Sequence, residues 1–219
     1  MTRRKDLNDL CRRRLGDVFP PNEFSDLQIN QWINDAIADY SLYVPRQFEY
    51  RISAEAGKHI YPLESISGLR NILSVAISPV EGKAIYFARR NEREPYRFYG
   101  RAVYDLKRDE NGQWQLVMGL TPQGGETICL VVEADHGYLG SDEEETTVPD
   151  LHLEWIVLFV RTAALQAQLA SVSAQNDPPS LLLSSLGNNA GRAMSEYQQK
   201  KKEILAATNV GSVIQLWEG

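Results

Sequence analysis

The segment from Ser25 to Tyr40 constrains the fold more strongly than any other part of the chain. Ser25 is a favourable helix N-cap, and Gln28, three residues later, completes a capping-box pattern. Apolar residues then recur at helical spacing, namely Ile29, Trp32, Ile33, Ala36, Ile37 and Tyr40. Polar residues occupy the intervening positions. The pattern predicts a helix that ends before Pro45 and buries one apolar stripe against a partner.

Apolar periodicity predicts three more helices, over residues 3–16, 150–172 and 189–207. Pro149 suits the first turn of the second of these helices, and Thr147 is its expected N-cap. The stripe of this second helix and the stripe described above each need a partner. We expect them to bury each other, at about 1.5–3 kcal/mol per large side chain.

Between residues 46 and 140 the chain is dominated by short β-prone stretches separated by turn residues. These stretches are Phe48–Ser53, His59–Leu63, Ile72–Ile77, Ala84–Phe87, Tyr96–Tyr104, Gln113–Met118 and Thr127–Ala134. Asn111-Gly112 is the best hairpin signal, because a type I′ turn needs positive φ at both central residues. The connections look too short for parallel crossovers, so an antiparallel sandwich or barrel is expected.

The order of these elements predicts an α+β protein. It consists of a helical bundle of about four helices with an inserted antiparallel β-rich domain, plus an extended C-terminal tail. We assign the bundle to residues 1–45 and 147–208, the insert to 46–146 and the tail to 209–219. An insert of this kind is common because insertions succeed where the two ends of the inserted segment lie close together.

Charge is unevenly distributed along the chain, whose formal net charge is −6. This balance argues against nucleic-acid binding by bulk charge. The first helix is nonetheless basic, and Arg12, Arg13 and Arg14 form a collar around its end. Such a collar can neutralise DNA phosphates, or it can stay solvated or contact an acidic protein neighbour. A run of four acids precedes the second apolar helix, at Asp142, Glu143, Glu144 and Glu145.

The two cysteines, Cys11 and Cys129, are far apart and each lies in an apolar pattern, so we expect reduced thiols in a reducing cytoplasm. No apolar run approaches the ~18 residues that a membrane span needs. The N-terminus lacks the apolar region of a secretory signal. We therefore expect no membrane partner.

A search for catalytic residues finds no convincing candidate set. The three histidines, His59, His136 and His152, show no zinc-ligand spacing. Neither a nucleophile-elbow motif nor a phosphate-binding glycine loop is present. Asp35 and Asp39 are four residues apart on one helix and are expected to face solvent. We predict that the chain is not an enzyme and has no catalytic, cofactor-binding or metal site.

The last residues contain an apolar, β-prone segment that follows Gly211, with Val213, Ile214, Leu216 and Trp217. A folded domain gains little from such a segment unless it is buried. Two interpretations remain open at this point. The segment either folds back as an edge strand on its own sheet or adds to the sheet of another chain, where backbone hydrogen bonds give affinity.

The chain resembles the head-to-tail adaptor (connector) proteins of tailed bacteriophages. Residues Asp26–Pro45 carry the resemblance, with the sequence DLQINQWINDAIADYSLYVP. Many such adaptors begin with a similar helix. The likeness continues at Tyr61-Pro62-Leu63, where the β-rich insert opens, and at Val148-Pro149, which leads into the apolar helix Leu151–Leu169.

The resemblance implies a homo-oligomeric ring, usually of about twelve subunits, that binds beneath the portal protein in the neck of the virion. Such a ring connects the capsid to the tail, extends the channel for double-stranded DNA and receives a stopper or tail protein on its lower face. It is assembled in the host cytoplasm. The C-terminal segment commonly docks to the portal, which favours insertion of Val213–Trp217 into a partner.

Within such a ring, the loop Asp142–Glu145 is expected to form an inter-subunit surface or to face the lumen, because it lies between the two blocks of the chain. The alternative function is a nucleic-acid-binding module that uses the basic N-terminal helix. Salt-sensitive DNA binding by the isolated chain would favour that alternative.

Overall fold

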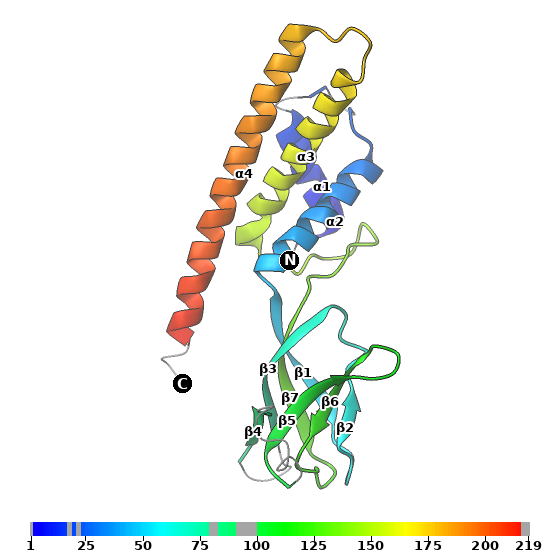
Figure 1. Ribbon diagram of the computed structural model, residues 1–219, viewed down its shortest axis with the longest axis vertical. Coiled ribbons are helices and arrows are strands. Elements are labelled where there is room, and N and C mark those ends of the chain that lie inside the picture. Colours follow the sequence, from blue (N-terminus) through cyan, green and yellow to red (C-terminus); the bar gives the residue numbers. More distant parts are fainter. Residues whose placement is uncertain (1, 17–18, 21–22, 79–82, 91–99, 216–219) are drawn as a thin grey trace. The chain divides into compact units, whose positions relative to one another are not determined.

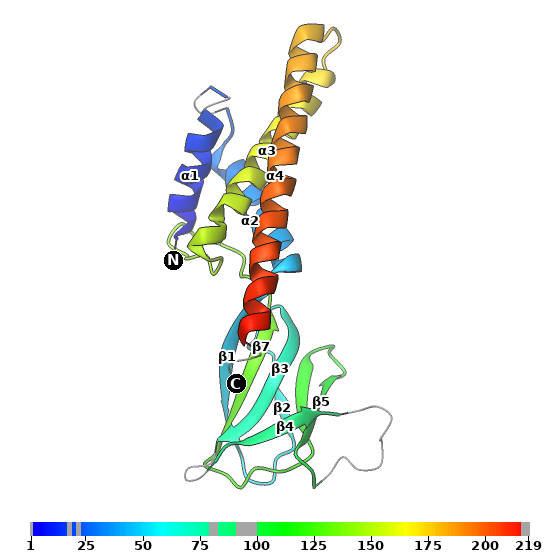
Figure 2. The ribbon, with the colours of Figure 1, turned by 90° about the vertical axis from the view of Figure 1, so that its left-hand side faces the viewer.

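The computed structural model (Figures 1 and 2) describes residues 2–16, 19–20, 23–78, 83–90 and 100–215, and the side chains of residues 209–215 are not described. The chain divides into two compact units. One unit comprises Met1–Pro45 and His136–Gly219, and it contains the helices. The other comprises Arg46–Asp135, and it contains the strands.

The helical unit has four α-helices and one short 3-10 helix. Their bounds are α1 Arg4–Gly16, α2 Asp26–Tyr43, η1 Asp150–His152, α3 Leu153–Ser173 and α4 Ser180–Gln215. All four α-helices contribute to one core, in which Trp155, Ile156 and Val160 of α3 are fully buried. Helices α3 and α4 pack side by side along most of α3 (Figures 1 and 2).

The start of α2 confirms the predicted capping box. The Ser25 hydroxyl accepts a hydrogen bond from the Gln28 backbone N–H at 3.3 Å, and the Gln28 side chain accepts one from the Ser25 N–H at 3.0 Å. Two otherwise unpaired donors are thereby satisfied. Thr147 is not the cap of α3, because the short helix η1 precedes α3 and the Thr147 hydroxyl contacts His136 instead.

The strand unit is one curled sheet of seven strands. Their bounds are β1 Arg46–Ser53, β2 Ile60–Pro62, β3 Leu69–Ser78, β4 Ile85–Arg89, β5 Val103–Arg108, β6 Trp114–Met118 and β7 Thr127–Ala134. The strand order is β1-β7-β3-β4-β5-β6-β2. Its inner face buries Val75, Leu116, Ile128, Leu130 and Val132 in a second core.

The predicted fold class, a helical bundle with an inserted antiparallel domain and an extended tail, is wrong. The protein is α+β, with four α-helices and a seven-stranded sheet that is mixed, because β4 and β5 pair in parallel. The sheet is a major part of the fold and not a small insert. The prediction of an extended tail from residue 209 is also wrong, since α4 continues as a helix to Gln215.

The hairpin between β5 and β6 lies at the predicted place but uses another turn. Gly112 has a φ of +78°, and its N–H donates to the Asp109 carbonyl at 3.0 Å. The Asp109 N–H donates to the Gln113 carbonyl, which closes a loop over 110–112. The Asp109 carboxylate also accepts from the N–H groups of Asn111 and Gln113. A longer loop capped by an aspartate therefore replaces the two-residue turn.

One stretch, Asp150–Ser173, is long and apolar enough by composition to cross a membrane, with a mean hydropathy of 1.4. The expectation that no apolar run approaches this length is therefore wrong. The core helix of a soluble unit passes the same test, and the residues Trp155, Ile156, Val160 and Leu165 are fully buried against the neighbouring helices.

Candidate functional site

The acidic loop is held by the N-terminal residues of the same chain. Arg3 and Glu145 form a β-bridge, and the Arg4 N–H donates to the Glu144 carbonyl at 2.9 Å. Side chains reinforce this backbone pairing, with Arg3 at 3.0 Å from Glu143 and Arg4 at 2.7 Å from Asp142. Two of the four acids are therefore neutralised within one subunit, which reduces their charge at any interface.

Glu144 supports the loop in another way. Its carboxylate accepts hydrogen bonds from the backbone N–H groups of Gly140 and Ser141. Glu145 is exposed, and in the described part of the chain no cation lies within 4.0 Å of its carboxylate. Of the four predicted residues, only Glu145 thus has a side chain without a partner in that part.

Replacing Asp142–Glu145 with Ser should lower the free energy of unfolding by about 1 kcal/mol at low salt, because the acid of each ion pair is exposed to solvent. The part of this difference that comes from the ion pairs should vanish near 1 M salt, where charges are screened within about 3 Å, whereas the part that comes from the two backbone hydrogen bonds to Glu144 should remain. Urea unfolding at both salt concentrations measures it, with Glu145→Ser alone as the matched control. An equal loss in the control would show that the ion pairs are not the cause.

The arginines of the predicted collar have three different environments. Arg12 lies 2.6 Å from Asp26 and also donates to the Phe24 carbonyl at 3.2 Å, so it ties α1 to the start of α2. Arg13 donates to a backbone carbonyl of its own helix at 3.4 Å. Arg14 is exposed, and within the described residues no carboxylate lies within 4.0 Å of it. Arg12 is thus engaged in the fold, while Arg13 and Arg14 keep their charges available.

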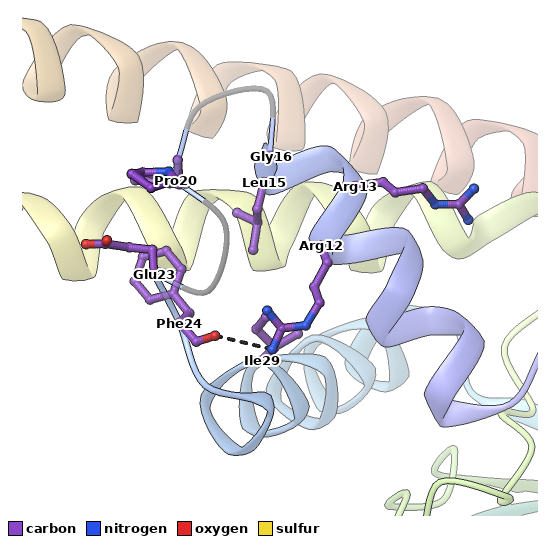
Figure 3. Close-up of a pocket in the computed structure, with 9 residues that line it drawn as sticks. Arg12, Arg13, Leu15, Gly16, Pro20, Glu23, Phe24 and Ile29 are labelled. Atoms are coloured by element: carbon purple, nitrogen blue, oxygen red, sulfur yellow. Dashed lines mark hydrogen bonds between the residues drawn. The ribbon is translucent and has the colours of Figure 1, made fainter.

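A pocket of about 300 Å³ lies between the end of α1 and the start of α2 (Figure 3). Its wall is mainly apolar, from Leu15, Phe19, Phe24 and Ile29. Figure 3 shows the Arg12 guanidinium turned toward the Phe24 carbonyl. Among the described residues that line it there is no histidine, cysteine or serine. The described wall of the pocket therefore suits an apolar group.

The densest polar cluster in the described part of the chain surrounds Asp39. Its carboxylate accepts hydrogen bonds from the Trp155 indole N–H at 3.1 Å and from the Tyr197 hydroxyl. The Lys201 ammonium lies 3.5 Å from the same carboxylate and 3.6 Å from the centre of the Tyr43 ring. Burial, and then the bond to Asp39, raise the pKa of Tyr197 above its ordinary value. The cluster joins α2, α3 and α4.

This cluster overturns one expectation of the sequence. Asp35 is exposed and accepts a hydrogen bond from Gln31 at 2.9 Å, as a solvent-facing residue can. Asp39 instead has a side chain only 23% exposed and is fully engaged by three donors. A usable signal was present, because Asp39 lies beside Tyr40 and Tyr43 at the edge of the apolar stripe. Its role is to join helices.

The histidines and cysteines lie in separate structural settings. His136 contacts the Val44 carbonyl and the Thr147 hydroxyl, and His59 contacts the Met118 carbonyl. Both cysteines are free, and burial raises the pKa of the Cys11 thiol to about 12. The described residues contain no group of three or more His, Cys, Asp or Glu side chains placed to hold a metal ion.

Stability should depend on pH through the 2.5 Å contact between the Tyr40 hydroxyl and Nδ1 of His152. Burial, and then Lys200, lower the pKa of His152 below 6.5, so below that pH the unfolded chain binds a proton that the folded chain excludes. Stability therefore falls as the pH drops below about 6.5. Burial raises the pKa of Tyr40 from 10.0 to about 12, so stability also falls as the pH rises through this interval.

Urea unfolding across this pH range measures the loss of stability on both the acid and the alkaline side. His152→Gln should reduce the slope of stability against pH on the acid side, and Tyr40→Phe should reduce it on the alkaline side, to which the raised pKa values of Cys11 and Tyr197 also contribute. A variant that keeps the original slope on its side of the pH range would contradict the assignment of that residue.

Two of the four predicted docking residues, Val213 and Ile214, lie in the last turns of α4. Leu205 is the last α4 residue that packs against the core among the described side chains. The helix backbone continues through Val213 and Ile214 to Gln215. Leu216 and Trp217 lie outside the described residues.

Comparison of the chain with protein-family models and with curated proteins finds no match in either case.

Proposed function

We propose that the protein is a structural adaptor of a tailed bacteriophage. In this proposal it forms a ring of about twelve copies beneath the portal, connects the capsid to the tail and extends the channel for double-stranded DNA. A stopper or tail protein binds the opposite face of the ring. The ring is part of the virion neck and is assembled in the host cytoplasm. It acts by binding and not by catalysis.

The observation that carries this proposal is the length of α4. The helix has 36 residues, whereas α3, against which it packs, has 21. Residues 206–215 extend the helix beyond Leu205 by about 15 Å. Their sequence includes three apolar residues, Val210, Val213 and Ile214, at spacings of i, i+3 and i+4. A helical arm of this composition is suited to burial against another protein.

The helical backbone also revises the expected mode of docking. Addition of a strand to a partner sheet requires an extended segment, but α4 is helical up to Gln215. We infer that this arm binds in a groove of the portal, where residues three and four apart share one face. Leu216 and Trp217 follow directly in the sequence and would lengthen the same contact.

Deleting Asn209–Gly219 should leave a folded chain that no longer binds the portal. Burial of each large apolar side chain contributes about 1.5–3 kcal/mol, so affinity should fall at least about 100-fold. A pull-down with the portal ring of the same phage measures binding, and circular dichroism confirms folding. The matched control replaces the exposed Leu181 and Leu182 at the other end of α4 with Ser. Normal portal binding by the truncated chain would refute the proposed role of the arm.

A further inference from the structure

The helical unit has a groove between α1 and α4, with α3 as its floor. Two adjoining depressions of about 570 and 450 Å³ form it, and both are lined by Arg14 and Glu154. Leu10, Leu153 and Val157 give the first depression its apolar floor. Figure 2 shows α1 and α4 on either side of α3. The apolar part of the groove therefore follows about one turn of α3.

Arg13 and Arg14, on the α1 side of this groove, are the lining cations that no carboxylate pairs with in the described part of the chain. Both arginines are exposed. Elsewhere along the groove Glu154 and Glu203 share Lys200, Glu196 contacts Arg161 and Arg192, and Asp150 keeps its charge while it accepts a hydrogen bond from Thr2. An occupant that places one acid beside Arg13 and Arg14 and apolar side chains on Leu10 would complement the α1 side of the groove.

The outer face of α2 has this chemistry. Asp35, Ala38 and Leu42 are exposed and follow one another at i, i+3 and i+7, over about 10 Å of helix. Leu42 is 64% exposed, although Ile37 on the opposite face is buried. Across the described residues no cation lies within 4.0 Å of the Asp35 carboxylate, which accepts a hydrogen bond from the side-chain amide of Gln31. We call Asp35, Ala38 and Leu42 the α2 ridge.

We propose that the α2 ridge of one copy docks into the α1–α4 groove of a second copy. Asp35 then pairs with Arg14, and Leu42 packs on Leu10 and Val157, in the manner of a helix bound in a groove. In Figure 2, α2 lies behind α3 and α4, whereas α1 and α4 flank α3 on the near side. Ridge and groove thus belong to different faces of one unit, so the contact is head to tail, and its repetition builds a ring where the rotation between copies closes.

Charge reversal tests this contact on the full chain. Asp35→Arg and Arg14→Asp should each weaken self-association at least tenfold, because each places like charges together. A 1:1 mixture of the two variants should recover association, since every interface of an alternating assembly then joins opposite charges. Native mass spectrometry and light scattering measure the size and composition of the assemblies. Asp177→Arg, at an exposed position in the loop before α4, is the control and should associate normally.

The contact is overturned if the mixture remains dissociated, or if the unaltered chain associates more weakly than about 1 mM. That this contact builds a ring rests on the proposed adaptor function. The experiments nevertheless distinguish a failure of the contact from a failure of the adaptor function. Self-association through this contact without portal binding would refute the adaptor function and support the contact. Portal binding by the chain, together with a variant mixture that does not recover self-association, would refute the contact alone.

Discussion

Replacing Trp155 with Ala is expected to destabilise the helical unit by about 3–5 kcal/mol. The side chain is fully buried at the centre of the core, where its ring lies 5.2 Å from that of Tyr40 and 6.1 Å from that of Tyr197. Removing it leaves a large cavity and also removes the N–H donor to Asp39. Urea unfolding followed by far-ultraviolet circular dichroism measures the loss in the helical transition.

Two variants separate the contributions of packing and hydrogen bonding. Trp155→Phe keeps an aromatic ring but leaves Asp39 with one donor fewer, so about 1–3 kcal/mol should be lost. Leu151→Ala lies four residues before Trp155, in η1, and Leu151 is 88% exposed, so the effect of this control should stay within about 0.5 kcal/mol. A loss for Trp155→Ala no larger than that of Leu151→Ala would show that this core does not depend on Trp155.

The parts of the fold that the sequence predicted well depend on neighbours along the chain. The capping box of Ser25 and Gln28 and the apolar stripe of α2 are local patterns, and the structure confirms both. The strand β7 likewise covers the β-prone stretch Thr127–Ala134 that the local sequence predicted. Periodicity and cap chemistry therefore identified these elements and their buried faces.

The errors concern interactions that local pattern does not encode. Strands β4 and β5 pair in parallel, and residues 90–102 connect them. This connection is long enough for the crossover that parallel strands need. Because a strand was predicted at Tyr96–Tyr104, this connection looked too short for a crossover. Residues 96–99 of that predicted strand lie outside the described part of the chain. At the end of α4, Gly211 reads as a break, but a helix tolerates one glycine at a cost of about 1 kcal/mol.

The candidate site shows the same limit for charged residues. The partners of Asp142 and Glu143 are Arg4 and Arg3, which are more than a hundred residues away in the sequence. No spacing rule connects such pairs, so the four acids looked like an unpaired loop. The partners of Asp39 are equally remote, on α3 and α4. Only tertiary packing shows which charges remain available, and these are the charges on which a docking surface depends.

Asp39→Ala is expected to cost about 3 kcal/mol, because it leaves a nearly buried cation without its counter-charge. The Lys201 side chain is only 12% exposed, and its ammonium lies 3.5 Å from Asp39. The Tyr197 hydroxyl and the Trp155 N–H would lose their acceptor as well. Urea unfolding measures the loss, with Asp9→Ala, at an exposed position on α1, as the control.

The double variant Asp39→Ala, Lys201→Met decides whether the charge pair causes this loss. Without the ammonium, the site no longer holds an uncompensated charge, and Met retains most of the apolar contact with the Tyr43 ring. The double variant should therefore be more stable than the sum of the two single losses implies, by at least about 1 kcal/mol. Strictly additive losses would show that Asp39 stabilises the three helices through Trp155 and Tyr197 alone, with no contribution from Lys201.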